Sequence, residues 1–316
     1  MAVAQKNSKV NKPPSYFTKL KKNIVLYKYA YIMIIPVLVF YIIFSYAPMY
    51  GAIIAFKNFS PKLGILGSEW VGLAQFKEIF RSQLFFRAFR NTITISLTSL
   101  ILCFPAPIIL ALLINEVRGK YFARAVQTAS YLPHFISLVV VCGMIKDFTL
   151  DTGVINDIIA FFGGERASLL NRPGAFLPIY IISDIWQGMG WGSVVYLSAL
   201  TGIDLQLYEA AEMDGAGRLA KIFNITLPGI APTIIMMLIL KIGSLLSVGY
   251  EKIILLYNPL TYESADVISS FVYRRGLQEM DWSFGTAVGL FNSIINCMLL
   301  FLSNGISRKF SDSSLW

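Results

Sequence analysis

Long runs of apolar residues without a charged side chain constrain this 316-residue chain more than any other feature. Four such runs cover residues 29–50, 91–114, 125–145 and 284–304. A backbone in lipid must satisfy its hydrogen bonds within the segment, so a run of about 20 apolar residues is typical of a membrane-spanning helix. With 56% hydrophobic and only 14% charged residues, the composition also differs from that of a soluble globular domain.

Two further apolar runs each contain a single charged residue. Residues 176–203 contain only Asp184, and residues 225–250 contain only Lys241. Both runs are long enough to span a bilayer, and an ionisable group at membrane depth usually faces a partner or a water-filled passage. The sequence therefore predicts an all-α membrane protein whose six transmembrane helices form one membrane domain, residues 29–305.

The distribution of Lys and Arg predicts which ends of the spans lie in the cytoplasm. The N-terminal tail, residues 1–28, is rich in lysine, and basic residues beside short membrane segments remain on the inside. An even number of spans returns the C-terminal tail, residues 306–316, to the same side, where Arg308 and Lys309 agree with this orientation. We therefore expect a multi-pass protein with both termini in the cytoplasm.

The net charge of +9 does not require a nucleic acid partner. A basic tail beside a membrane attracts anionic lipid headgroups, with about 1 kcal/mol for each lysine near the surface. The three cysteines lack metal-ligand spacing, and the single histidine, His134, lies in an apolar run. Carboxylate pairs occur only in loops, without a nearby nucleophile. The sequence therefore predicts neither a catalytic residue nor a metal site.

The largest predicted cytoplasmic loop, residues 204–228, contains the stretch YEAAEMDGAGRLAKIFNITLP. Residues 205–214 are mostly helix formers, Gly215 and Gly217 interrupt them, and a helical pattern then resumes until Pro228. This pattern predicts a short helix, a tight turn and a second short helix. On its own it is compatible with a solvated connecting loop and with a surface that docks a basic partner.

This loop resembles the EAA loop in the membrane subunits of ATP-binding-cassette importers. The matching features are Glu-Ala-Ala at 209–211, Asp-Gly-Ala at 214–216 and Leu-Pro at 227–228, just before the fifth predicted span. The resemblance implies a coupling helix that docks in a groove of a cytoplasmic ATPase. The residues that it implies for docking, and for the link to the fifth span, are Glu209, Ala210, Ala211, Asp214, Gly215, Leu227 and Pro228.

The resemblance covers most of the chain. Residues 113–137, 183–216 and 248–277 look like permeases that import oligosaccharides and polysaccharide fragments. It implies a bacterial cytoplasmic membrane, a second homologous permease subunit in a heterodimer, two ATP-binding subunits and an extracellular sugar-binding protein. The sequence lacks a G-x-x-x-x-G-K-[ST] phosphate loop, so ATP and Mg²⁺ would bind to the ATPase and this chain would not be an enzyme. The implied mechanism is alternating access.

Polar residues at membrane depth are the candidates for a sugar passage. They are Asp184, Trp186, Gln187 and Lys241. Asp184 and Gln187 are three residues apart and should share a helix face. Lys241 could snorkel or pair with Asp184 between the fourth and fifth spans, and we prefer such a structural role. If the substrate is a uronic acid oligomer, Lys241 would instead be its counter-charge.

Two other functions fit the same residues. The same importer architecture could serve another solute. Alternatively, the chain could be a non-transporting membrane subunit of a sensor complex, in which the loop docks a regulatory protein. Substitution of Glu209 or Gly215 discriminates between a transporter and a sensor, since only a transporter would lose both uptake and ATPase coupling.

Overall fold

The computed structural model describes residue 23, residues 25–117 and residues 119–310. Most of the predicted N-terminal tail and the end of the predicted C-terminal tail therefore lie outside the described residues. The chain divides into two compact units, Met1–Ile53 and Ile54–Trp316. The described residues are helical almost throughout, which confirms the predicted all-α class.

The described part of the first unit is one helical run that continues to the start of the second unit. Helix α2 (Lys28–Tyr41) passes through a π-helical turn (Ile42–Tyr46) and α3 (Ala47–Met49) into a 3-10 segment (Tyr50–Phe56). The run is long and apolar enough to cross a membrane, and none of the residues of α2 is buried within the chain. Its position coincides with the predicted first span, residues 29–50.

The second unit is built around helix α11. This helix packs against α7, α8 and α14, while α14 also packs against α18. The described residues contain one sheet, in which β1 (Lys57–Asn58) pairs with β2 (Glu69–Trp70) in antiparallel fashion. The helices of this unit are α4 (Gly64–Gly67), α5 (Ala74–Ile79), α6 (Gln83–Leu102), α7 (Pro105–Asn115), α8 (Lys120–Tyr131), α9 (Leu138–Thr149), α10 (Val154–Phe161), α11 (Pro173–Leu200), α12 (Leu205–Met213), α13 (Arg218–Lys221), α14 (Leu227–Gly243), α15 (Tyr250–Leu256), α16 (Tyr262–Ala265), α17 (Ile268–Val272) and α18 (Trp282–Phe310).

Within the described residues, four helical runs are long and apolar enough to cross a membrane. They are Lys28–Phe56, Gln83–Asn115, Arg218–Gly243 and Trp282–Lys309. The bent pair Lys120–Phe135 and Leu138–Phe161 adds a fifth candidate if it is one span. Helix α11, which covers the predicted fourth span, has 28 residues but is not among these candidates, because its polar, glycine and tryptophan residues lower its mean hydropathy.

The predicted third span, residues 125–145, is not a continuous helix. The segment Lys120–Phe135, which contains α8 and a 3-10 turn (Leu132–Phe135), is bent by 96° from the segment Leu138–Phe161, which contains α9 and α10. The physical reason is Pro133, which has no backbone N–H to donate and clashes with the preceding turn of an α-helix. The chain therefore changes direction within a stretch that hydropathy alone predicts as one straight helix.

The predicted fifth span, residues 225–250, is displaced toward the N-terminus. The helical run covers Arg218–Gly243 and includes α13, a π-helical turn (Ile222–Thr226) and α14. It ends at Gly243, and residues 244–249 form an irregular turn. Serine and glycine in this segment have low helix propensity, so the helix ends. Neither residue is charged, so the apolar run in the sequence continues past the end of the helix.

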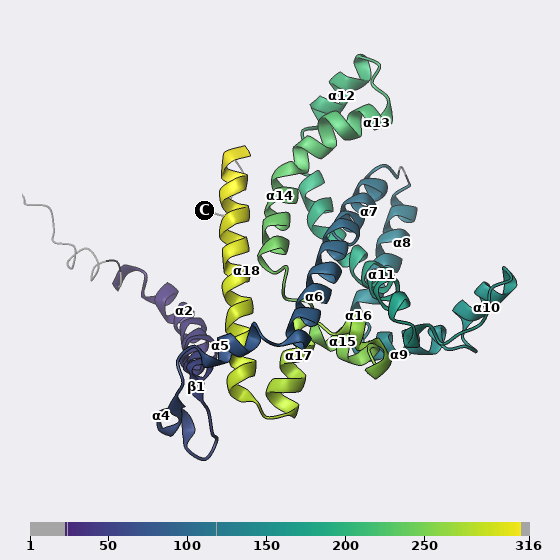
Figure 1. Cartoon of the computed structure of the whole chain (residues 1–316). Helices are drawn as coiled ribbons and strands as arrows, with labels where there is room; N and C mark the ends of the chain where they lie inside the picture. The colour runs from purple at the N-terminus through teal and green to yellow at the C-terminus, as the bar shows by residue number, and fades with distance from the viewer. Residues whose placement is uncertain (1–22, 24, 118, 311–316) are drawn as a thin grey trace, which may run out of the picture. The chain divides into compact units, whose positions relative to one another are not determined.

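The second unit has two ends with different structures. Figure 1 shows α12 and α13 projecting beyond one end of the packed helices, whereas α10, α15 and α17 lie toward the other end. The predicted docking loop and the segment after α14 are thus separated along the long helices.

Candidate functional site

A cavity of about 470 Å³ lies where α6, α11, the end of α14 and α15 meet. The predicted residues Asp184, Gln187 and Lys241 all line it, so the structure brings together three of the four candidates for the sugar passage. The other polar side chains that line the cavity are those of Ser96, Ser99, Tyr180, Ser244, Ser247, Tyr250, Glu251 and Lys252.

An ion pair between Asp184 and Lys252 joins α11 to α15 at this cavity. The Lys252 Nζ donates to Asp184 Oδ1 at 3.2 Å and to the backbone oxygen of Tyr180 at 3.3 Å. The ammonium also lies 4.7 Å from the centroid of the Tyr180 ring, within the range of a cation–π interaction. Three interactions therefore replace the water that the buried lysine loses.

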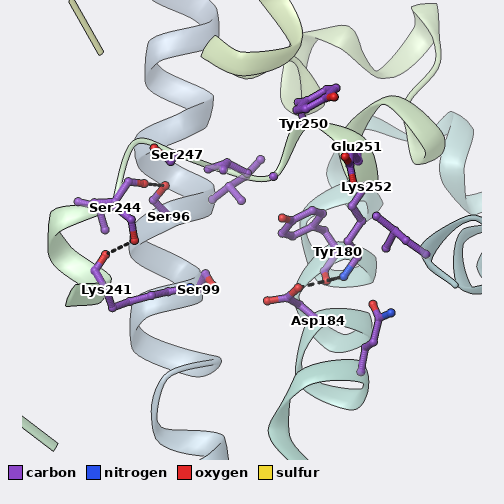
Figure 2. Close-up of a pocket in the computed structure, with 16 residues that line it drawn as sticks. Ser96, Ser99, Tyr180, Asp184, Lys241, Ser244, Ser247, Tyr250, Glu251 and Lys252 are labelled. Atoms are coloured by element: carbon purple, nitrogen blue, oxygen red, sulfur yellow. Dashed lines mark hydrogen bonds and ion pairs between the residues drawn. The ribbon is translucent and has the colours of Figure 1, made fainter. Parts of the chain in front are cut away.

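The predicted pair between Lys241 and Asp184 is wrong, because the carboxylate is paired with Lys252. Figure 2 shows Lys241 and Asp184 on opposite sides of the cavity. Lys241 lies in the last turn of α14, and the chain then turns so that α15 approaches α11. Among the described residues, the Lys241 ammonium has no carboxylate within ion-pair distance.

The arrangement of the cavity follows from helical spacing and from an apolar anchor. Tyr180, Asp184 and Gln187 are four and three residues apart on α11, so they share one helix face. The buried side chains of Ile253 and Leu256 on α15 belong to the same apolar cluster as Tyr180. This packing fixes α15 against α11 and places Lys252 beside Asp184.

Side chains from two other helices hold the turn after α14. The Ser96 hydroxyl on α6 donates to the backbone oxygen of Leu245 at 2.5 Å. Asn296 on α18 accepts from the Leu246 N–H at 3.0 Å and donates to the Ser247 hydroxyl at 2.9 Å. An irregular backbone is stable where protein groups satisfy its hydrogen bonds, as Ser96 and Asn296 do here.

Lys252 was missed by the sequence reasoning. It lies between the predicted spans 225–250 and 284–304, in a connecting segment where a charged residue is ordinary, and its pairing requires α15 to fold back onto α11. The signal in the sequence is the apolar stretch Ile253–Leu256, which is unusual directly after a lysine in a solvated loop.

Trp186 does not share the cavity with the other candidates. It lines a separate, almost entirely apolar cavity of about 270 Å³ between α9, α10 and α11, together with Met144, Phe148 and Ile182. On a helix, residues two apart point in different directions, so Trp186 cannot face the same way as Asp184. The structure thus separates the predicted aromatic residue from the predicted polar ones.

The cavity offers hydroxyl, carboxylate, ammonium and phenol groups. These groups donate and accept hydrogen bonds in the way that sugar hydroxyls and carboxylates require. Within the part of the chain that the structure describes, no group of three or more His, Cys, Asp or Glu side chains could hold a metal ion. The chemistry of the cavity is therefore that of polar recognition.

The predicted helix-turn-helix in the loop 204–228 is confirmed as local structure. The Asp204 side chain caps α12 by accepting from the Gln206 N–H at 3.0 Å. Gly215 adopts a φ of +76°, which favours glycine, and the N–H of Ala216 reaches back to the oxygen of Ala211 at 2.8 Å. Helix α13 then begins at Arg218 and continues toward α14.

Two side-chain contacts hold α12 against the start of the next helical run. The Tyr208 hydroxyl lies 3.0 Å from Thr226 Oγ1, and Lys221 Nζ lies 2.7 Å from Glu212 Oε1. Thr226 is buried, so the hydroxyl contact is shielded from water. These contacts therefore join α12 to the helical run that leads into α14.

The residues predicted for docking lie mostly at the surface of this loop. Glu209, Ala210, Asp214 and Gly215 are exposed, and Ala211 is half-buried. Leu227 is half-buried within an apolar cluster with Ile230, while Pro228 occupies the first turn of α14. The exposed surface combines carboxylates with small residues, and the apolar Met213 beside them is 90% exposed.

Comparison with protein families identifies the chain. Residues 103–309 match the model of the family described as binding-protein-dependent transport system inner membrane component. The chain belongs to this family. The predictions of a membrane component and of a permease subunit that is not itself an enzyme are therefore confirmed, and the membrane location agrees with the apolar helices.

Individual relatives of this permease cover almost its whole length. The polygalacturonan/rhamnogalacturonan transport system permease protein YteP of Bacillus subtilis (strain 168) is 44% identical, over 94% of this chain and 93% of the relative. A chain in the crystal structure of a bacterial alginate transporter, in complex with a periplasmic protein that holds an alginate pentasaccharide, is 43% identical. It has a TM-score of 0.87 and covers 94% of this chain and 100% of its own length.

A second solved structure agrees with the first. It is described as a bacterial transporter involved in the import of the acidic polysaccharide alginate, and a chain in it is 44% identical. The TM-score is 0.85, with 92% of this chain and 99% of the other chain covered. All three of these relatives are named for the transport of polysaccharides.

Proposed function

We propose that this permease forms one half of the passage through which a bacterial importer carries acidic oligosaccharides into the cytoplasm. The observation that carries the proposal is the Lys241 ammonium, which lines the central cavity and has no ion-pair partner among the described residues. An ammonium in such a position is a counter-charge for a substrate carboxylate. The names of the three relatives support a substrate of this class, because polygalacturonan and alginate are both polymers of uronic acids.

The proposed mechanism is alternating access with a separate motor. An extracellular binding protein delivers the oligosaccharide, and two ATP-binding subunits, which hold ATP and Mg²⁺, drive the change of state. Helix α12 docks on one of them through Glu209, Ala210, Ala211, Asp214 and Gly215. The contact between Tyr208 and Thr226 supports a transfer of movement from α12 to α14, at whose other end Lys241 lies.

The proposed topology has six spans, with both termini and α12 in the cytoplasm. It counts the bent pair α8 and α9 as one span and includes α11, whose polar face lines the cavity. A second, homologous permease subunit would pack beside this chain and shield the polar face of α11 from lipid. Figure 1 supports this arrangement, since α12 and the segment α15–α17 lie toward opposite ends of the second unit.

The substrate class is tested by the substitution Lys241→Met in the assembled transporter in proteoliposomes. The probes are trigalacturonate and its neutral trimethyl ester. We expect uptake of trigalacturonate to fall about tenfold, the equivalent of one charge-assisted hydrogen bond, while uptake of the ester is unchanged. Lys77→Met is the matched control, because Lys77 is exposed on α5 and does not line the cavity. Unchanged uptake of trigalacturonate would exclude Lys241 from recognition.

Docking of the ATPase is tested by Glu209→Lys. Reversal of this charge should weaken an interface that includes a basic groove by a factor of about 10 to 100. Uptake and the stimulation of ATP hydrolysis by the saccharide-loaded binding protein should fall together. Lys309→Glu, a charge reversal at the end of α18, serves as the control. A transporter that retains full uptake with Glu209→Lys would contradict the docking surface, and ATP hydrolysis without any uptake in the unmodified protein would favour a sensor.

A further inference from the structure

The two partners of the ion pair between Asp184 and Lys252 differ in their access to the cavity. The Lys252 side chain is 6% exposed, whereas that of Asp184 is 36% exposed. Lys252 is also held by the backbone oxygen and the ring of Tyr180. The ammonium is therefore fixed by the protein, and the carboxylate is the partner that a ligand in the cavity can reach.

The chemistry of this pair limits what can replace Asp184. Removal of the partner from a buried ammonium is strongly unfavourable unless another acceptor takes its place. A second carboxylate restores a charge-assisted hydrogen bond, whereas a sugar hydroxyl offers only a neutral acceptor, with roughly half the strength. An acidic saccharide can thus exchange with Asp184, and a neutral saccharide cannot do so at equal cost.

We propose that Asp184 is an internal competitor for Lys252 and thereby limits how tightly the site binds acidic saccharides. In the empty cavity the Asp184 carboxylate is paired with the Lys252 ammonium. When the saccharide binds, a uronate carboxylate takes the place of Asp184 in this pair. Lys241 lines the same cavity, so a second ammonium is available to the released Asp184 or to a neighbouring uronate. The inference rests on the proposed function, and it adds a residue that tunes the affinity for acidic saccharides.

The test is direct binding to the assembled transporter in nanodiscs, without nucleotide and without the binding protein. Isothermal calorimetry with trigalacturonate and with its trimethyl ester compares the unmodified protein with Asp184→Asn. Because the amide of this variant would compete only as a neutral acceptor, trigalacturonate should bind about tenfold more tightly, while the affinity for the ester changes less than about twofold. Equal or weaker binding of trigalacturonate by this variant would overturn the proposal.

Glu251→Gln is the control for a general change in the electrostatic field. Glu251 lines the same cavity, and its carboxylate has no ion-pair partner among the described residues. This substitution removes one negative charge but does not free Lys252. A similar tightening in Glu251→Gln and Asp184→Asn would show that the field of the cavity, rather than competition for Lys252, sets the affinity.

Substitutions of Lys252 show whether Asp184 acts through this lysine. Lys252→Met should lower the preference for trigalacturonate over the ester to the part that Lys241 supplies, and Lys252→Arg should retain the full preference. Addition of Asp184→Asn to Lys252→Met should cause no further change, because the two residues form one unit. A tightening that persists in the double variant would overturn the proposal.

The two proposals fail in different ways. If the unmodified transporter shows no preference for trigalacturonate over its ester, the proposed substrate class is wrong. If that preference is present but Asp184→Asn does not increase it, the competition is wrong and the substrate class stands. If Asp184→Asn and Lys252→Arg both lower the yield and the affinity for the two probes equally, the pair is only structural and the competition is excluded.

Discussion

The loop 204–228 and the central cavity differ in how far apart in sequence their contacting residues lie. In the loop, Tyr208 and Thr226 are 18 residues apart. At the cavity, Asp184 and Lys252 are 68 residues apart, and Ser96 and Leu245 are 149 apart. The loop is thus built from contacts within one short stretch, whereas the cavity exists only after four helices have packed together.

This difference determines how each region can fail. A substitution in the loop should change the coupling of the transporter and leave the assembled protein intact. A substitution at a close helix contact near the cavity should instead prevent assembly. Three predictions test this distinction, from the largest expected effect to the smallest.

The largest effect is expected for Gly190→Ala on α11. A Cβ atom at this position would lie 1.9 Å from the backbone oxygen of Ser130 on α8, where neither backbone can move independently. Overpacking of this kind costs about 3 kcal/mol, so the yield of monodisperse transporter and its thermal midpoint should both drop sharply.

Gly188→Ala provides the matched control on the same helix. Apart from its chain neighbours and the backbone of its own helix, no described residue has an atom within 4 Å of a Cβ at Gly188, so the assembled yield should be unchanged. If both variants assemble equally well, the packing of α8 against α11 does not limit the assembly of this protein.

An intermediate effect is expected for Gly215→Ala in the loop. With a φ of +76°, a side chain at Gly215 costs about 1–2 kcal/mol and should displace the end of α12. We expect uptake and saccharide-stimulated ATP hydrolysis to fall severalfold together, without loss of assembled protein.

Gly217→Ala is the control for this substitution. Gly217 has a φ of −71°, which any residue can adopt, and apart from its chain neighbours no described residue has an atom within 4 Å of a Cβ there. An equal loss of uptake in both variants would mean that the side chain itself, and not the left-handed backbone, disturbs docking.

The smallest effect is expected for Glu212→Gln. The pair between Glu212 and Lys221 is at the surface, and its carboxylate side chain is 65% exposed. Exposed ion pairs contribute about 0–1 kcal/mol, so uptake at physiological salt should remain within about twofold of the unmodified protein. A loss as large as that from Gly215→Ala would show that this pair, rather than the turn, carries the coupling.

The accuracy of the sequence predictions follows the same division. The helix-turn-helix of the loop was predictable because helix formers, glycines and a proline specify it locally. The apolar runs predicted six spans, whereas the described residues contain four candidates, or five if the bent pair is one span. Pro133 bends one predicted span, and another ends at Gly243, before its apolar run does. The pair of Asp184 with Lys252 was not predictable, since a fold-back of α15 brings these residues together.

The sequence by itself determined that this is an α-helical membrane permease with a short helical loop between two long apolar runs. Backbone hydrogen bonding in lipid and local turn preferences act within a segment, so they can be deduced from the order of the residues. Only the tertiary structure decided which lysine meets Asp184, which face of α11 lines the cavity and where Lys241 lies. These outcomes depend on how close the helices approach one another, and that distance is set by side chains far apart in the chain.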